Sequence, residues 1–166
     1  MPVSELHDDD YWMGKALLEA RKALRCAEVP IGAILVQDGK IIARGFNQRE
    51  SKQDPTAHAE LIAIRRAARK IGAWRLTGAT LYVTLEPCPM CMGAILLARV
   101  ERVVFACFDP KGGAAGSLYD LTADRRFNHQ VQVTSGIRQG ECSAMLSDFF
   151  RELRKEKKAA KLIAVE

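Results

Sequence analysis

Two cysteines three residues apart are the first residues in this sequence whose spacing suggests chemistry. Cys88 and Cys91 lie in LEPCPMC (85–91), directly after a short apolar run. If a helix begins here, both sulfurs lie on the same face of its first turn. Pro89 fits the first helical position because no amide hydrogen bond is lost there. The positive end of the helix dipole also favours the thiolate that binds metals. The pattern therefore indicates a metal site, although a redox pair or two buried small side chains would have the same spacing.

A third ligand is supplied by the sequence HAE, which begins at His58. His58 is expected to open a second helix with Thr56 as its N-cap. Glu60 follows two residues later, so the two side chains converge only if His58 occupies an irregular first turn. Zinc prefers nitrogen and sulfur ligands, and a catalytic zinc keeps one position open for water. We therefore predict one Zn2+ per chain, bound by His58, Cys88 and Cys91. Glu60 would carry protons beside it instead of acting as a fourth ligand.

The remaining cysteines and histidines match no comparable pattern. Five cysteines form an odd and unevenly spaced set, which argues against a disulfide framework. For Cys26, Cys107 and Cys142 we expect packing in the core or at an interface. His129 is expected to be a structural hydrogen-bonding residue.

The composition fits a single globular domain over residues 1–166. The chain is 48% hydrophobic and 27% charged, and its formal net charge of +5 is compatible with a polyanionic partner. The first ten residues are acidic and polar, unlike a signal peptide. No apolar stretch approaches the roughly 20 residues that cross a bilayer. We therefore expect a cytoplasmic protein with no membrane partner.

The elements that must position these residues alternate between helix and strand. Asp38-Gly39 suits a tight hairpin turn, apolar residues three and four apart indicate helices, and short β-branched runs indicate strands. Polar loops are expected at 47–56 and 108–130. This alternation predicts a three-layer α/β domain with crossover connections. The expected elements are helix 8–27, hairpin 31–46, helix 58–71, strand 79–85, helix 89–99, strand 100–107, strand 131–134 and helix 140–162.

HAE and PCPMC together resemble the signature of the zinc-dependent nucleoside and nucleobase deaminases. The similarity covers nearly the whole chain and points to the bacterial tRNA adenosine deaminases. Agreement is weaker at Cys107, at Phe108 and over 119–130. The stretches that carry the resemblance are VPIGAILV (29–36), GFN (45–47), DPTAHAE (54–60), TLYVTLEPCPMCMGA (80–94), RVVF (102–105), GAAGSL (113–118) and LSDFFR (146–151).

This resemblance implies a cytidine-deaminase-like α/β/α fold with a mixed five-stranded sheet, and a homodimer. It also implies conversion of the wobble adenosine of a tRNA anticodon stem-loop, expected in an arginine tRNA, to inosine. The glutamate would then move protons to N1 of adenine and to the departing ammonia. Asn47 would hydrogen-bond the purine, Val29 and Pro30 would line the base pocket, and Asp109 would lie beside the target nucleotide. Without the resemblance, these four read as ordinary turn or strand-edge residues.

The predicted C-terminal helix concentrates positive charge. Residues 151–161 include six basic and two acidic side chains. Arg151 and Arg154, beside Phe149 and Phe150, are expected to contact RNA phosphates and to stack on a loop base. The alternative is a solvated basic face whose phenylalanines belong to the core.

Three other functions are compatible with the sequence. Enzymes that deaminate a free nucleobase or nucleotide, of the guanine or deoxycytidylate type, share both motifs. A silent RNA-binding or structural subunit would keep zinc for folding but would gain little from Glu60. A variant engineered to act on single-stranded DNA would also retain these residues.

Overall fold

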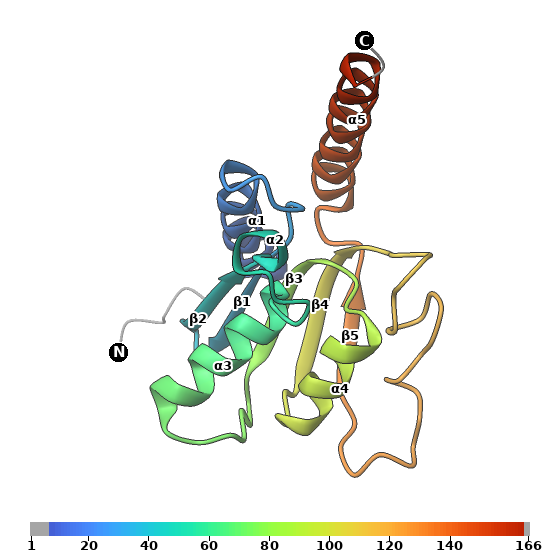
Figure 1. Ribbon diagram of the computed structural model, residues 1–166. Coiled ribbons are helices and arrows are strands. Elements are labelled where there is room, and N and C mark those ends of the chain that lie inside the picture. Colours follow the sequence, from blue (N-terminus) through green and yellow to red (C-terminus); the bar gives the residue numbers. More distant parts are fainter. Residues whose placement is uncertain (1–6, 165–166) are drawn as a thin grey trace.

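The computed structural model describes residues 7–164; residues 1–6 and 165–166 of the predicted domain lie outside the described residues. A mixed sheet with strand order β2-β1-β3-β4-β5 forms its centre (Figure 1). β1 pairs antiparallel with β2 and β3, whereas β3, β4 and β5 run parallel. The expected α/β fold with a mixed five-stranded sheet is confirmed. The strands are β1 (Gly32–Gln37), β2 (Lys40–Phe46), β3 (Thr80–Leu85), β4 (Arg102–Cys107) and β5 (Gln132–Ser135).

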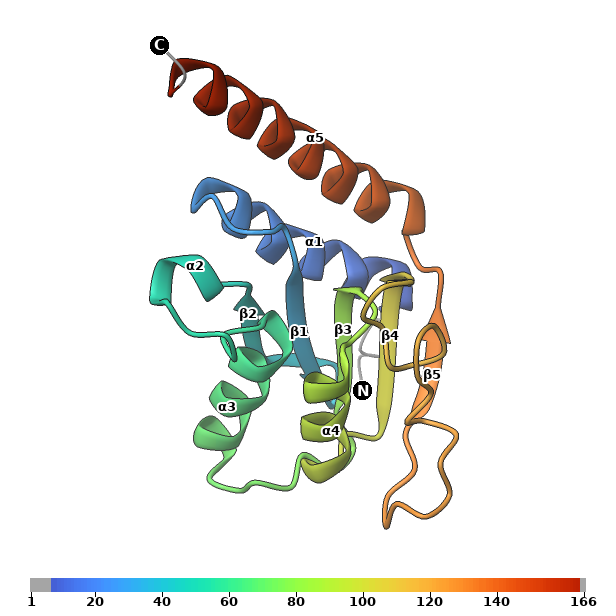
Figure 2. The same ribbon diagram turned by 45° about the vertical axis from the view of Figure 1, so that its right-hand side comes forward.

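Helices cover both faces of the sheet (Figure 2). α1 and α5 pack on one face, and α3 and α4 pack on the other. Neighbouring strand residues serve opposite layers: Ile34 of β1 belongs to the apolar cluster beneath α1, and Leu35 to the cluster beneath α3 and α4. The helices are α1 (Asp9–Arg25), α2 (Arg49–Lys52), α3 (Ala59–Ile71), α4 (Pro89–Leu97) and α5 (Gln139–Ile163).

Close packing of β2 against α3 fixes where α3 begins. Gly45 on β2 has no room for a side chain, because a Cβ there would lie 2.3 Å from the carbonyl oxygen of Ala59. The turn that leads into β2, Asp38-Gly39, has positive φ at both residues, as predicted for a tight hairpin. Since Ala59 is the first residue of α3, this contact holds the preceding residue, His58, at the edge of the sheet.

The short helix α2 interrupts the predicted loop 47–56, so that part of the loop prediction is wrong. Its start is held by a distant residue: the backbone N–H groups of Glu50 and Ser51 donate to the buried carboxylate of Glu28, at 3.3 and 2.6 Å. This carboxylate acts as a cap that is remote in the sequence. α2 therefore depends on a tertiary contact, and it fixes the direction of its first residue, Arg49.

α5 extends well beyond the sheet (Figures 1 and 2). Cys142 is buried near its start, whereas from residue 151 onward the residues are almost all exposed. Ion pairs between Arg151 and Asp148 and between Lys155 and Glu152 run along this surface. The basic half of α5 is thus open to a partner. In the part of the chain that the structure describes, no helix combines the length and apolar character needed to span a membrane.

The other cysteines and His129 have structural surroundings. Cys107 and Cys142 are buried in the cluster beneath α1, as expected. Cys26 is exposed at the end of α1, so of the two expected environments, core or interface, the core is wrong for this residue and the interface stays a prediction. The His129 ring nitrogen Nε2 lies 2.6 Å from the carbonyl oxygen of Val100, which fits the structural hydrogen bond predicted for it.

Candidate metal centre and catalytic pocket

Three ligand atoms converge between the N-termini of α3 and α4. His58 Nδ1 lies 3.7 Å from Cys88 Sγ and 3.5 Å from Cys91 Sγ, and all three atoms lie within 4.8 Å of one another. With the usual Zn–N and Zn–S bond lengths, tetrahedral zinc separates nitrogen from sulfur by about 3.6 Å. Both the spacing and the donor set therefore fit one Zn2+. The Glu60 carboxylate is not part of this group, which leaves a fourth position for water.

The two helix starts direct these side chains toward the centre. His58 is the N-cap of α3 and Cys88 is the N-cap of α4, both with extended backbone and without a side-chain hydrogen bond to their helix. Thr56 is therefore not the N-cap, and that prediction is wrong, because its hydroxyl donates within the preceding turn instead. Pro89 begins α4 as predicted. Since His58 precedes the regular helix, Glu60 can face the same centre although it lies only two residues away.

Glu60 is a buried carboxyl group with the ionisation of a proton carrier. Its side chain is only 4% exposed. Burial raises its pKa from 4.5 to about 7, and the nearby charge of His58 opposes this rise. A group whose pKa lies near neutrality can both accept and donate a proton during a reaction. Glu60 is thus suited to acid/base chemistry and less suited to the role of a permanent negative charge.

The cysteine pair holds one negative charge before any metal binds. The Cys91 thiol donates to the Cys88 sulfur, and this bond, together with His58, lowers the pKa of Cys88 to about 4. The same bond and burial raise the pKa of Cys91. The hydrogen bond from His58 to Cys88 also raises the pKa of His58. Metal binding must therefore displace a proton from Cys91, whereas the Cys88 thiolate is already formed.

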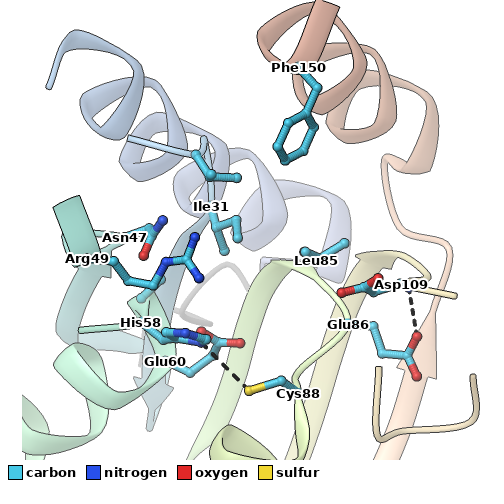
Figure 3. A pocket seen from close by; sticks show the side chains of 12 residues that line it. Ile31, Asn47, Arg49, His58, Glu60, Leu85, Glu86, Cys88, Asp109 and Phe150 are labelled. Atoms are coloured by element: carbon cyan, nitrogen blue, oxygen red, sulfur yellow. Dashed lines mark hydrogen bonds between the residues drawn. The ribbon is translucent and has the colours of Figure 1, made fainter. Parts of the chain in front are cut away.

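A cavity of about 200 Å³ opens above the metal ligands. Figure 3 shows His58, Glu60 and Cys88 at its floor and Phe150 of α5 at its mouth. A wider cavity of about 610 Å³ adjoins it, lined in part by Lys111. The small cavity suits one planar base, and the wider one suits the groups attached to that base. The remaining wall of the small cavity includes Val29, Ile31, Leu85, Asn47, Arg49 and Asp109.

Three of the four predicted pocket residues line this cavity. Val29, Asn47 and Asp109 lie in its wall. Asn47 is 3% exposed, so its amide is almost fully shielded from solvent. Pro30 is buried and is not among the lining residues, which makes it a support for Val29 in the chain rather than part of the wall.

The residues predicted on the C-terminal helix separate into two groups. Phe150 lines both cavities, whereas Phe149 lines neither. Arg154 lines the wider cavity, and Arg151 instead pairs with Asp148 on the outer surface. Successive residues on a helix point about 100° apart, so only one of two adjacent phenylalanines can face the cavity.

Five residues that line the small cavity were not predicted from the sequence: Ile31, Arg49, Ala59, Leu85 and Glu86. Glu86 had a usable signal, because an acidic residue between an apolar strand and a predicted metal ligand needs an explanation. Arg49 had none, because its direction depends on the distant cap of α2. Ile31 directly precedes β1 and Leu85 ends β3. An apolar residue at such a position is expected in the hydrophobic core, so neither had a signal for the cavity.

Known proteins with this sequence pattern are deaminases. The family described as MafB19-like deaminase matches residues 7–154. The tRNA-specific adenosine deaminase of Bacillus subtilis (strain 168) is 59% identical over 153 residues, which make up 92% of this chain and 95% of that relative. This chain belongs to the tRNA-specific adenosine deaminase family. It is therefore an enzyme, and His58, Glu60, Cys88 and Cys91 are its candidate active-site residues.

Solved structures of deaminases share the fold of this member of the tRNA-specific adenosine deaminase family. One, from work on A-to-I editing by tRNA:A34 deaminases at the wobble position of transfer RNA, has a TM-score of 0.79 and 46% identity over 82% of this chain and 99% of that chain. A guanine deaminase from Bacillus subtilis has a TM-score of 0.59 and 40% identity over 61% of this chain and 66% of that chain. Of these two structures, the one from the tRNA:A34 deaminase work matches a larger share of both chains.

Proposed function

We propose that this enzyme hydrolyses the 6-amino group of the wobble adenosine in a tRNA anticodon loop, expected in an arginine tRNA, and leaves inosine and ammonia. The observation that carries the proposal is the buried Glu60 carboxyl beside a His-Cys-Cys ligand set at the floor of a base-sized cavity. Membership of the tRNA-specific adenosine deaminase family supports the choice of substrate.

His58, Cys88 and Cys91 would hold one Zn2+ per subunit. A bound zinc ion would supply Lewis acidity that lowers the pKa of a water and makes it a nucleophile near neutral pH. Glu60 would accept a proton from that water and deliver it to N1 of the adenine as oxygen bonds to C6. It would then carry the remaining hydroxyl proton from C6 to the amine as the C6–N6 bond breaks, which leaves the C6 carbonyl and ammonia. Its pKa of about 7 suits both directions of transfer.

The cavity walls would hold the purine. The Asn47 amide can hydrogen-bond the edge of the base, while Val29 and Ile31 provide apolar contact beside it. Phe150 at the mouth is placed to stack on a nucleotide. Asp109 would lie beside the sugar of the target nucleotide. A base inside a helix cannot enter such a cavity, so the substrate must present it from an unstacked loop.

Positive charge around the mouth would attract the RNA backbone. Arg49 lies on one side, and Lys111 and Arg154 lie in the adjoining cavity. The exposed basic half of α5, which includes Arg151 on its outer surface, would add positive charge beyond the mouth. These side chains come from three separate elements, which suits a folded stem-loop better than a small free nucleoside.

A homodimer is the assembly that we propose. α4 carries apolar side chains on its outer side as well as toward the core: Leu97 is 70% exposed and Met90 is 37% exposed. Exposed apolar residues on a helix next to the active site suit contact with a second copy of the chain.

Free-nucleobase deamination is the second candidate, because a guanine deaminase shares the fold at 40% identity. The basic surface around the mouth has no role in such a reaction. If the chain is a variant engineered to act on single-stranded DNA, it should deaminate a DNA hairpin of matched sequence. A silent structural subunit would have no use for the buried Glu60.

The test is to incubate the zinc-loaded protein with an arginine tRNA anticodon stem-loop and to sequence the product for inosine. We expect about one zinc per chain by mass spectrometry and inosine at the wobble position, with loss of inosine in Glu60→Ala. Parallel reactions contain guanine, a deoxycytidylate nucleotide and a DNA hairpin of the same sequence. Zinc without inosine on any tRNA, together with turnover of a free nucleobase, would contradict the proposal.

A further inference from the structure

The carboxylate of Glu86 is the common acceptor for one whole loop. Glu86 is 2% exposed and directly follows β3. It accepts hydrogen bonds from the backbone N–H groups of Asp109 at 2.9 Å, Ala115 at 3.0 Å and Ser117 at 3.0 Å. The Ser117 hydroxyl donates to it as well. One side chain thus binds both ends of the segment 109–117.

The backbone of the segment 109–117 packs directly against the Glu86 carboxylate. A Cβ at Gly113 would lie 2.2 Å from the carboxyl carbon of Glu86, so the loop touches the carboxylate with bare backbone. The Ala114 N–H also donates to the carbonyl oxygen of Pro87 at 2.8 Å. The loop is therefore fastened to the same turn that presents the metal ligand Cys88.

This loop carries two groups that face the substrate cavities. Asp109 lines both cavities and Lys111 lines the wider one. The Asp109 side chain is itself oriented, because its Oδ1 accepts from the Lys111 N–H at 3.1 Å. Figure 3 shows the Glu86 carboxylate turned toward this loop and away from Glu60, with the Asp109 backbone bonded to it.

We infer that Glu86 is a positioning residue that sets the place of Asp109 relative to the metal centre, and that it thereby aligns the entering nucleotide with Glu60. The inference rests on the proposed function. Burying a carboxylate is costly unless donors satisfy it, and here neutral donors converge on both of its oxygens. An apolar side chain at this position would leave three N–H groups, among them the buried one of Ala115, without this acceptor. The loop would then lose its fixed distance from Cys88.

The first test is a double-mutant cycle between Glu86→Gln and Asp109→Asn, measured as kcat and KM on the stem-loop at full zinc occupancy. Glu86→Gln alone is expected to raise KM about tenfold, with a smaller effect on kcat, because the nucleotide is misplaced while the metal site is intact. In the Asp109→Asn background, Glu86→Gln is expected to raise KM by less than about threefold. Both substitutions impair the same contact, the one between the Asp109 side chain and the nucleotide. Equal factors in both backgrounds would overturn the inference.

Glu19→Gln provides the matched control. Glu19 is also a buried carboxylate at 2% exposure, but it lies on α1 and pairs with Lys22 and Arg44. This variant is expected to change the unfolding midpoint and to leave KM unchanged. If Glu19→Gln raises KM as much as Glu86→Gln does, the effect is general loosening and the positioning role is wrong.

A second variant covers the case in which Glu86→Gln does not fold. Ser117→Ala removes one donor and keeps the carboxylate, so a rise in KM of about threefold that depends on Asp109 is expected; no rise would overturn the inference. Amide hydrogen exchange gives a readout that needs no substrate: in Ser117→Ala the amides of Asp109 and Ala115 are expected to exchange at least about tenfold faster than in Glu19→Gln. Wild-type protein that is inactive on every stem-loop would refute the proposed function alone, whereas unchanged exchange would refute the anchoring.

Discussion

The candidate active centre contains one buried carboxyl group whose pKa is raised toward neutrality. Glu60 is buried and has a pKa of about 7, beside three residues whose nitrogen and sulfur atoms fit zinc. Glu60→Gln keeps the shape of the side chain but removes the titration. We expect a loss in kcat of about 10²- to 10⁴-fold with zinc retained, since general acid/base transfer contributes that much. Single-turnover inosine formation measures this, and a loss below about tenfold would contradict the assigned role.

The same pKa predicts how stability depends on pH in the zinc-free protein. The folded state binds the Glu60 proton more tightly than the unfolded chain does, because the pKa rises from 4.5 to about 7. Folding therefore becomes less favourable as pH rises from 4.5 to 7. Relative to wild type, Glu60→Gln should gain about 3 kcal/mol over this interval and remain constant above it. Urea unfolding of both proteins in a chelator at pH 4.5 and 8 tests this, and parallel pH profiles would be the contrary result.

Arg49 has a separate prediction because it lies in the wall of the small cavity and its charge acts on His58. Arg49→Gln should weaken stem-loop binding and reduce the slope of log affinity against log salt by about 0.7, as expected for one lost phosphate contact to a single strand. Fluorescence anisotropy in the Glu60→Ala background measures binding without turnover. Arg69→Gln, an equal charge change at the far end of α3, should leave the slope unchanged; equal effects of both variants would point to net charge alone.

Individual residues differ in how far the sequence predicts them. His58, Glu60, Cys88 and Cys91 were predictable because metal chemistry restricts both residue type and spacing. Phe150 could not be chosen over Phe149, since the rotation of α5 about its axis is set by tertiary packing. Arg49 depends on a partner far along the chain, Glu28, and no local pattern contains that information. The position of Glu86 before a metal ligand is a local signal, but its partners at 109–117 are not visible in the local sequence.

Among the elements, the contact between β2 and α3 is where packing and catalysis meet. Gly45 allows the two to approach so closely that a Cβ would meet the carbonyl oxygen of Ala59 at 2.3 Å. Gly45→Ala should therefore cost about 2–3 kcal/mol of stability and should displace His58, with weaker zinc binding. Gly140→Ala on α5, where a Cβ meets nothing within 4 Å, should be neutral or stabilising by up to about 1 kcal/mol. Denaturant unfolding with a zinc-release assay tests both, and a stable, zinc-tight Gly45→Ala would contradict this account.

The succession of helices and strands was largely predictable. The hairpin, the central strand β3 and the helices that begin at the metal ligands follow from apolar periodicity, turn residues and Pro89. The start of α3 agrees with the predicted helix 58–71 to within one residue, but the predicted N-cap, Thr56, is wrong because His58 occupies that position. α2 was missed because its cap comes from Glu28.

At the scale of the whole molecule, we expect two copies of the chain to form a homodimer. Leu97, 70% exposed on α4, is the apolar side chain that such a contact should cover. Leu97→Glu should convert a dimer into monomers in sedimentation experiments and should lower activity, because α4 carries Cys91. Leu18→Glu, at an exposed apolar position on α1, should leave the assembly intact. A wild-type monomer, or a Leu97→Glu dimer, would show that the surface has another role.

The Cys88 thiolate has a consequence for the protein once zinc is lost. With a pKa of about 4 and a half-buried side chain, its sulfur would be ionised and within reach of soft electrophiles at neutral pH. Iodoacetamide should then label Cys88 only in metal-depleted chains. Peptide mapping separates the Cys88 adduct from one at the exposed Cys26, so the Cys88 adduct alone would count the fraction without zinc. Chelation would cease to be reversible after alkylation or oxidation, so the ion would act as the chemical protecting group of its own binding site.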